Sequence, residues 1–381
     1  HTSMLAKCNA ARAGGCAAGL RAGLRCYCSA SPAKVARQHL GPWKGHKFDV
    51  LEGIINAGAP SSALYEYLHE NSISRLEHYV RSGDDDAAFG ISEAGVIRLA
   101  SAMQNSSDSD QELLLYGALG VAGAHAVGDA LLRCSSLRRL AIFDTRIGPE
   151  GTAALARALA VNTGLSSLEL SCEANARLEP LALDAPSCPE TRTARPRASD
   201  NDMRPEGLTA LAEALRSNTG LGLLDLSGNV LCDLWQRRDG SRDGTYTIHG
   251  VVALADALCV NQALHSIDLS HNELGSEGAT AIGKSLEENN ALAILGLRLN
   301  SIDGDGAAAL TMPLATNTTL SMLDLRENGQ FGPRALQAID ELFLIRKASG
   351  FPSLLLKHDG NQPRSRTRSS VRRTRGRAFR K

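Results

Sequence analysis

Aromatic residues and long apolar runs are both scarce in this chain of 381 residues. Phe, Trp and Tyr make up 4% of it, and no apolar run approaches the roughly 18 residues that a membrane-spanning helix needs. We therefore expect no membrane span. The nine cysteines include no CxxC pair and lack the spacing of a disulfide framework. A zinc ribbon, a thioredoxin motif and a disulfide-stapled secreted domain are accordingly not indicated.

Motifs of common catalytic and metal sites are also missing. No GxSxG, HExxH, Walker or GxGxxG pattern occurs. Asp303-Gly-Asp305 resembles the start of a calcium loop, but Leu314 occupies the twelfth position, where a Glu is required. His265 and His271 have no third ligand at a suitable spacing. We expect no enzyme activity, no cofactor and no bound metal.

Charge is distributed unevenly, although 41 basic and 41 acidic residues give a net charge of zero. Residues 1–48 contain eight basic residues and no acidic one, and residues 363–381 contain nine basic residues and no acidic one. Residues 49–362 therefore carry a net charge of −17. Such asymmetry is typical of an acidic body flanked by basic tails or targeting segments.

The first segment has the composition of a targeting sequence. Residues 1–31 are rich in Ala, Gly, Ser and Arg, and they resemble an organellar transit peptide. Arg25-Cys26-Tyr27 resembles a matrix-processing site. We expect a mitochondrial location, with the plastid and the cytoplasm as alternatives. The other interpretation of the segment is a flexible basic arm that stays on the protein.

A repeat of 28 residues organises the middle of the chain. Its first half is L-x-x-L-x-L-x-x-N-x-L, as in the stretch from Leu264 to Leu274, and further copies start at Leu137, Leu165, Leu221, Leu292 and Leu320. Its second half, as in 279–286, is apolar every three to four residues, which is the period of a helix with one buried face. Each repeat is therefore predicted to be a short strand, a turn and a helix. The Asn should bond unpaired backbone groups where the chain leaves the strand.

This pattern is that of the leucine-rich repeat. The 28-residue period and the stretch from Leu274-Gly-Ser-Glu-Gly278 into an Ala-rich helix resemble the ribonuclease-inhibitor type. That type includes ribonuclease inhibitor, the Ran GTPase-activating protein and the repeat domains of NOD-like receptors. The resemblance covers about residues 89–345 and implies an α/β solenoid, a horseshoe with parallel strands on its concave face and helices on its convex face. The family shares a shape rather than a reaction.

Four segments are predicted from these patterns. They are a basic transit-like or flexible segment (1–48), a helical N-terminal cap (49–88), the solenoid (89–357) and a disordered Arg-rich tail (358–381). Within the cap, the apolar positions of 64–68 and 76–80 predict helices.

Two insertions interrupt the repeat period, near residues 173–201 and 232–244. Both follow a strand and precede a helix, so both should emerge at the same edge of the solenoid. Insertions on one face of a solenoid often mark the binding face. Neutral surface loops are the alternative, because loop-closure entropy grows slowly with length.

The strand positions between leucines should project from the concave face. The residue inside each L-x-L forms one column, and the residue two further on forms a second; parallel strands stack such residues about 4.8 Å apart. The result is an acidic stripe that turns basic toward the C-terminal repeats, with all its side chains expected to be exposed. Asp as a habit of the repeat consensus is the alternative. The candidate partner-binding residues are Phe143, Glu169, Asp225, Asp268, Arg298, Asp324 and Arg326.

These features predict a non-catalytic scaffold for protein–protein interaction, with a subunit of an organellar assembly as one form of it. The partner is expected to have a basic surface. One alternative is a regulator or activator of a small GTPase, by resemblance to the Ran regulator. Another is an RNA-associated protein, or one that binds an anionic surface, through its tail. The tail residues concerned are Arg364, Arg366, Arg368, Arg372, Arg373, Arg375, Arg377 and Arg380.

Overall fold

The structure is a computed structural model, and it describes residues 46–70, 75–81, 91–103, 111–171, 201–236, 242–329 and 331–358. Nearly all of the transit-like segment, most of the first insertion and the whole Arg-rich stretch of the tail lie outside the described residues. The predictions made for those segments stay predictions.

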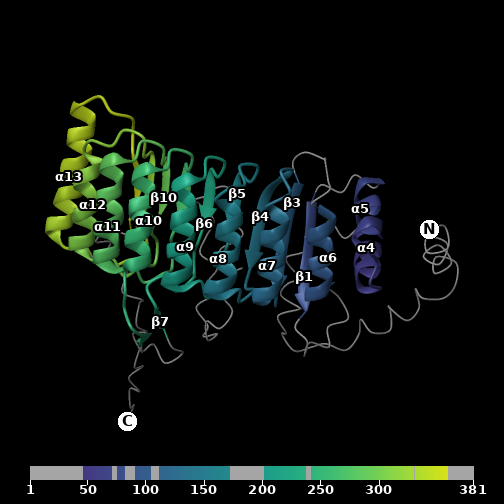
Figure 1. The fold of residues 1–381 in the computed structure, drawn as a ribbon. Helices are drawn as coiled ribbons and strands as arrows, with labels where there is room; N and C mark the ends of the chain where they lie inside the picture. Colours follow the sequence, from purple (N-terminus) through teal and green to yellow (C-terminus); the bar gives the residue numbers. More distant parts are fainter. Residues whose placement is uncertain are drawn as a thin grey trace, which may run out of the picture.

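Ten short parallel strands form one continuous sheet along the described chain (Figure 1). Neighbours in the sheet are almost always neighbours in sequence, as repeats stacked one on the next require. From the N-terminal end the strands are β2 (Ile91–Ser92), β1 (Arg75–Arg81), β3 (Gln111–Gly117), β4 (Leu137–Phe143), β5 (Ser167–Glu169), β6 (Leu223–Asp225), β9 (Ser266–Asp268), β10 (Ile294–Gly296), β11 (Met322–Asp324) and β12 (Leu355–Lys357).

A row of helices covers one face of this sheet (Figure 1). The predicted α/β leucine-rich-repeat solenoid, with strands and helices in separate layers, is thereby confirmed. The helices are α4 (His46–Asn56), α5 (Ser61–Glu70), α6 (Glu93–Met103), α7 (Gly120–Leu131), α8 (Gly148–Leu159), α9 (Arg204–Ser217), α10 (His249–Val260), α11 (Gly275–Glu288), α12 (Gly304–Leu314) and α13 (Pro333–Ala348).

The core lies between the sheet and the helices and runs through all the repeats. In the repeat of β9, Leu264 and Leu269 are 0% exposed and Ile267 is 1% exposed. Leu254 and Leu258 of α10 are equally buried and belong to the same apolar cluster. No single repeat could bury these side chains alone, so each depends on its neighbours for stability.

Asparagine amides connect successive repeats before and after each strand. Asn272 donates from Nδ2 to the carbonyl oxygens of Leu226 and Leu269, and its Oδ1 accepts from the backbone N–H of Asn229. Before the strand, Asn261 donates to the carbonyl oxygens of Leu215 and Asn218. The predicted role of the repeat Asn is confirmed, because these bonds satisfy backbone groups that the short strands leave unpaired.

The segment 76–80 is part of a strand and not a helix. It belongs to β1, which pairs in parallel with β3 from Arg75↔Glu112 to Val80↔Gly117. Leu76, His78 and Val80 are buried, which is the alternation of a strand rather than the period of a helix. The helix prediction for this part of the cap is therefore wrong, whereas α4 and α5 are helical.

The described parts of the two insertions have different structures. The second contains an antiparallel hairpin of β7 (Leu234–Gln236) and β8 (Arg242–Gly244). At the end of the first, Asn201 donates from Nδ2 to the carbonyl oxygen of Ile142, and its Oδ1 accepts from the backbone N–H of Thr145. Asn201 thus makes the bonds of a repeat Asn and does not belong to the insertion, contrary to the sequence interpretation.

Candidate functional site

The strand register brings the predicted column together on the concave face. Ala141, Glu169, Asp225, Asp268, Gly296 and Asp324 are consecutive partners across the sheet. Their neighbours in sequence are the buried leucines that face the helices, and alternate residues of a strand point to opposite faces. The column is therefore aligned on the sheet face opposite the helices.

Full exposure of the seven candidate residues was expected, and the structure contradicts it. Phe143, Glu169 and Asp324 are buried, with 1%, 8% and 7% of their surface exposed. The other four are half-buried: Asp225, Asp268, Arg298 and Arg326. The physical reason is that the columns pack and pair among themselves, as the following contacts show.

Phe143 is part of an apolar cluster rather than a free anchor. Its ring centroid lies 5.0 Å from that of Tyr116 on the adjacent strand. Leu114 and Ala141 complete the cluster, and both are buried. Phe143 therefore stabilises the N-terminal part of the concave face.

Glu169 is neutralised by a side chain that the sequence interpretation missed. Arg139 of β4 donates from Nε to Glu169 Oε1 at 2.7 Å and from Nη2 to Oε2 at 3.1 Å. Glu112 lies 3.8 Å from Nη1 of the same guanidinium. The signal was available, because Arg139 precedes the column residue Ala141 by two positions and so shares its face.

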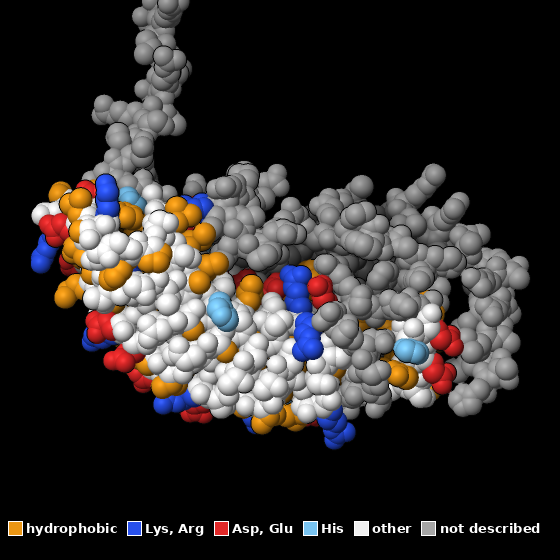
Figure 2. Space-filling model, turned by 90° about the horizontal axis from the view of Figure 1, so that it is seen from above, with side chains coloured by type: hydrophobic (Ala, Val, Ile, Leu, Met, Phe, Trp, Pro, Cys, Tyr) orange, Lys and Arg blue, Asp and Glu red, His pale blue; other side chains and the backbone are white. Residues whose placement is uncertain are grey.

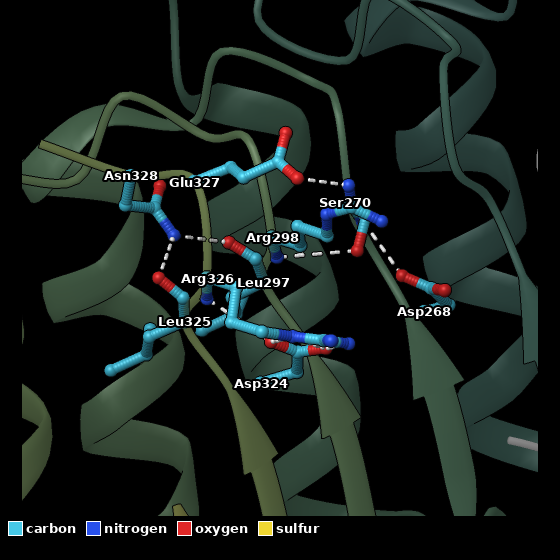
Figure 3. Close-up of polar contacts among 9 residues, drawn as sticks. All are labelled: Asp268, Ser270, Leu297, Arg298, Asp324, Leu325, Arg326, Glu327 and Asn328. Atoms are coloured by element: carbon cyan, nitrogen blue, oxygen red, sulfur yellow. Dashed lines mark hydrogen bonds and ion pairs between the residues drawn. The ribbon is translucent and has the colours of Figure 1, made fainter. Parts of the chain in front are cut away.

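The basic end of the predicted stripe is neutralised in the same way (Figure 3). The Nε of Arg326 donates to both oxygens of Asp324, at 2.9 and 3.1 Å. Arg298 forms an ion pair with Glu327. The stripe therefore does not turn basic, since each of these arginines has a carboxylate beside it.

Two adjacent carboxylates remain in the middle of the concave face. Asp225 and Asp268 are direct partners in the register, and neither forms an ion pair within the described residues. The Oδ1 of Asp225 accepts from the backbone N–H of Ser227 at 2.8 Å, and that of Asp268 accepts from Ser270 at 2.9 Å. These bonds hold both carboxylates in place without neutralising their charge.

Burial and mutual repulsion disfavour the charged form of this pair. Burial, followed by the neighbouring charge of Asp268, raises the pKa of Asp225 to about 7. Burial also raises the pKa of Asp268, and the charge of Asp324 adds to this, whereas hydrogen bonds from Ser270 and the charge of Arg298 oppose it. A cation placed between the two carboxylates would relieve both effects.

Gly296 makes room for the carboxylate of Asp268. A Cβ at Gly296 would lie 2.5 Å from Asp268 Oδ1, far inside contact distance. The absence of a side chain at this position thus allows Asp268 to lean along the column toward β10.

A mainly apolar column, interrupted by Ser266, runs beside the carboxylates. The residues two positions earlier on each strand pair in register. They are Leu223, Ser266, Ile294, Met322 and Leu355, which are half-buried apart from the exposed Leu355. The concave face therefore offers apolar contact next to negative charge.

Other kinds of site were sought in the described residues. They contain no group of three or more His, Cys, Asp or Glu side chains placed to hold a metal ion. None of the described helices is both long and apolar enough to cross a membrane. Seen from above, the described surface is largely uncharged, with most Lys, Arg, Asp and Glu side chains along its margins (Figure 2).

Comparison with known families agrees with the repeat geometry. The family model described as "Leucine Rich repeat" matches residues 133–156 and 260–283. The first match contains β4 and most of α8, and the second contains β9 and most of α11. The described part of the chain therefore has the fold of a leucine-rich-repeat solenoid. No curated protein matches it.

Solved structures resemble parts of this chain at low sequence identity. The structure titled "Leiomodin-1 Actin-Binding Site 2 (ABS2)" is 24% identical, covers 38% of this chain and 73% of its own, and has a TM-score of 0.29. A yeast Rad7–Elc1 complex contains a chain that is 13% identical, with 82% and 84% covered and a TM-score of 0.28. At these scores the similarities carry no functional argument.

Proposed function

We propose that this leucine-rich repeat protein is a non-catalytic interaction module whose partner places a basic side chain against Asp225 and Asp268. One observation carries the proposal: two adjacent, half-buried carboxylates at the centre of the concave face form no ion pair within the described residues. A Lys or Arg side chain would donate charge-assisted hydrogen bonds to both carboxylates. Leucine-rich repeat domains are in general protein-interaction modules, which agrees with this assignment.

The surroundings of the pair define the partner further. Arg139, Arg298 and Arg326 are already paired with carboxylates of this chain, so they add little attraction for an acidic partner. Ile294 and Met322 lie beside the carboxylate column. The partner segment should therefore combine apolar residues with at least one basic residue.

Several finer aspects of the function remain proposals from the sequence. The 28-residue spacing supports repeats of the ribonuclease-inhibitor type. The composition of residues 1–48 supports a mitochondrial location and hence an organellar assembly. The alternative of RNA binding rests on the Arg-rich tail, which lies outside the described residues.

Comparative affinity purification tests the proposal. The baits are the full chain, the double variant Asp225→Asn/Asp268→Asn and a control, Glu213→Gln/Asp256→Asn, that removes the same charge from exposed positions of α9 and α10. Proteins retained by the wild type and the control but lost from the double variant support the proposal. Identical sets of proteins on all three baits contradict it.

A further inference from the structure

The two ends of the solenoid are finished differently. At the N-terminal end, α4 and α5 cover the first strands, and Leu51, Ile55 and Leu64 are 0% exposed. At the other end, β12 and α13 are the last elements of their layers (Figure 1). Terminal repeats of a solenoid normally turn a polar face outward, because no further repeat covers them.

The last repeat instead exposes apolar side chains. Leu356 is half-buried, whereas the residues at the same position in three preceding repeats, Ile267, Leu295 and Leu323, are 0–1% exposed. Next to it, Leu355 is 48% exposed. Within the described residues no further repeat covers these two side chains, which stay partly in contact with solvent.

Helix α13 adds to this surface. In earlier repeats, the side of the helix that faces the next repeat is marked by glycines such as Gly283, whose added Cβ would lie against Ala309 and Leu310 of α12. The equivalent side of α13 has Leu336 and Phe343, seven residues apart, with the exposed Asp340 between them on the same side of the helix. Leu336 is half-buried and Phe343 is 38% exposed. Leu336, Phe343, Leu355 and Leu356 together are termed the C-terminal end surface.

The edge of β12 that faces away from β11 has backbone hydrogen-bonding groups beside these apolar side chains. Leu355 donates to the carbonyl oxygen of Ser321 at 2.8 Å, and the carbonyl of Lys357 accepts from Leu325 at 2.7 Å, both toward β11. Alternate residues of a strand point their N–H and C=O to opposite edges, so those of Leu356 point away from β11. Within the described residues, β12 pairs with β11 alone.

We propose that the C-terminal end surface binds the same surface of a second copy of this chain. Two copies related by a two-fold axis would place Leu356 opposite Leu356. In an antiparallel pair such residues exchange both N–H···O bonds, so each copy satisfies the groups that the other leaves free. The apolar side chains of one copy would contact the apolar side chains of the other, because an isologous interface uses the same surface of both copies.

The chain that follows β12 does not suit this surface. Residues 359–381 have apolar side chains only at Pro363, Val371, Ala378 and Phe379, and the stretch 363–381 has nine basic residues. A segment of this composition lacks the apolar spacing needed to act as a further repeat. A second copy has suitably placed apolar side chains, namely those of its own C-terminal end surface. The inference does not depend on the partner site on the concave face.

Sedimentation equilibrium of the full chain, over a range of protein concentrations and at low and high salt, tests the inference. The expected result is a dimer that persists at high salt, since apolar and backbone contacts are not screened. Phe343→Glu and Leu355→Glu should each raise the dissociation constant at least about tenfold, because each would bury an unpaired carboxylate. Val161→Glu is the control, as Val161 is 66% exposed in the middle of the solenoid.

Hydrogen exchange at Leu356 provides the second measurement. Its amide should exchange more slowly at concentrations where the dimer forms than at concentrations where the monomer dominates. Four results would overturn the inference. They are a monomer throughout, a dimer unaffected by both variants, association that disappears at high salt and so belongs to charged segments, or a dimer in which the Leu356 amide is unprotected.

Discussion

The guanidinium of Arg346 donates a hydrogen bond to the main-chain carbonyl oxygen of Asn317. A second bond goes from the same Nη1 to the carbonyl oxygen of Leu314. In the preceding repeat, Asn317 itself makes the equivalent two bonds, to Leu286 and Asn289. Arg346 thus takes the place of the repeat asparagine in the last repeat, and its Nη2 also donates to Pro352, in the segment leading to β12.

Replacing this guanidinium should destabilise the C-terminal repeats. Arg346→Met keeps much of the aliphatic stem but leaves the carbonyls of Leu314 and Asn317 without their donor. Each buried unsatisfied carbonyl costs about 1–3 kcal/mol, so urea unfolding should show a loss of at least about 1 kcal/mol. Unchanged stability would mean that water replaces the guanidinium at no cost.

The core of a central repeat should be sensitive to truncation. Leu269 is 0% exposed and belongs to the continuous apolar cluster. Leu269→Ala should reduce the free energy of unfolding by about 2–5 kcal/mol, because it leaves a cavity shared by neighbouring repeats. A loss below about 1 kcal/mol in chemical denaturation would contradict the assigned repeat packing.

The raised pKa of Asp225 predicts how stability depends on pH. The folded value is about 7 and the ordinary value is 3.8, so the folded state holds the proton more strongly. The contribution of this proton is complete below the ordinary pKa and is lost as the pH rises through about 7. Asp225→Asn keeps an acceptor for Ser227 but has no proton to lose, so it should be stabilising relative to the wild type at pH 8.

Thermal unfolding of the wild type and Asp225→Asn at pH 5 and pH 8 measures this difference. The advantage of the variant should be larger at pH 8 than at pH 5. Asp256→Asn, at an exposed position of α10, should show no such dependence. An equal advantage at both pH values would place the pKa of Asp225 outside this range.

The position of Asp268 can be changed without changing its charge. Gly296→Ala adds a methyl group that would lie 2.5 Å from Asp268 Oδ1, so the carboxylate must move while the fold stays intact. Binding of a basic partner should weaken. Gly222→Ala is the matched control, since its nearest contact would be 3.6 Å. Equal binding of a recovered partner by both variants, measured by calorimetry, would show that the carboxylate position is unimportant.

Import provides a separate test of the N-terminal segment. A fusion of residues 1–48 to a fluorescent protein should accumulate in mitochondria, because a basic segment without acidic residues suits a transit peptide. Microscopy with a mitochondrial marker measures this. A diffuse cytosolic signal would reject the localisation.

The fold was predictable because each repeat restates the same constraint. The Leu positions at 264, 267 and 269 recur with a fixed period, so one error in a single repeat could not alter the result. The strand β1 was not predicted, because Leu76, His78 and Val80 show the alternation of a strand without the consensus of the repeat. The role of Asn201 as a repeat asparagine was missed because this residue follows an insertion. The stretch Asn201-Asp-Met203-Arg-Pro-Glu-Gly207 nevertheless keeps the spacing of Asn272 to Gly278.

The candidate site was predictable in position but not in charge. Spacing alone places Glu169, Asp225 and Asp324 on one face in register. It does not reveal that Arg139 and Arg326 neutralise two of them, because ion pairs depend on side-chain conformations across strands. In the described column, the carboxylates that form no ion pair are therefore Asp225 and Asp268.

The most direct measurement is the dissociation constant of a partner recovered by affinity purification, determined by calorimetry at pH 8 for three proteins. They are the wild type, Asp225→Asn/Asp268→Asn and the control Glu213→Gln/Asp256→Asn. If the central carboxylates bind a basic side chain, the double variant should weaken binding at least about tenfold, which corresponds to about 1.4 kcal/mol, and the control should not. Equal dissociation constants for all three proteins would contradict the account and place the partner site away from Asp225 and Asp268.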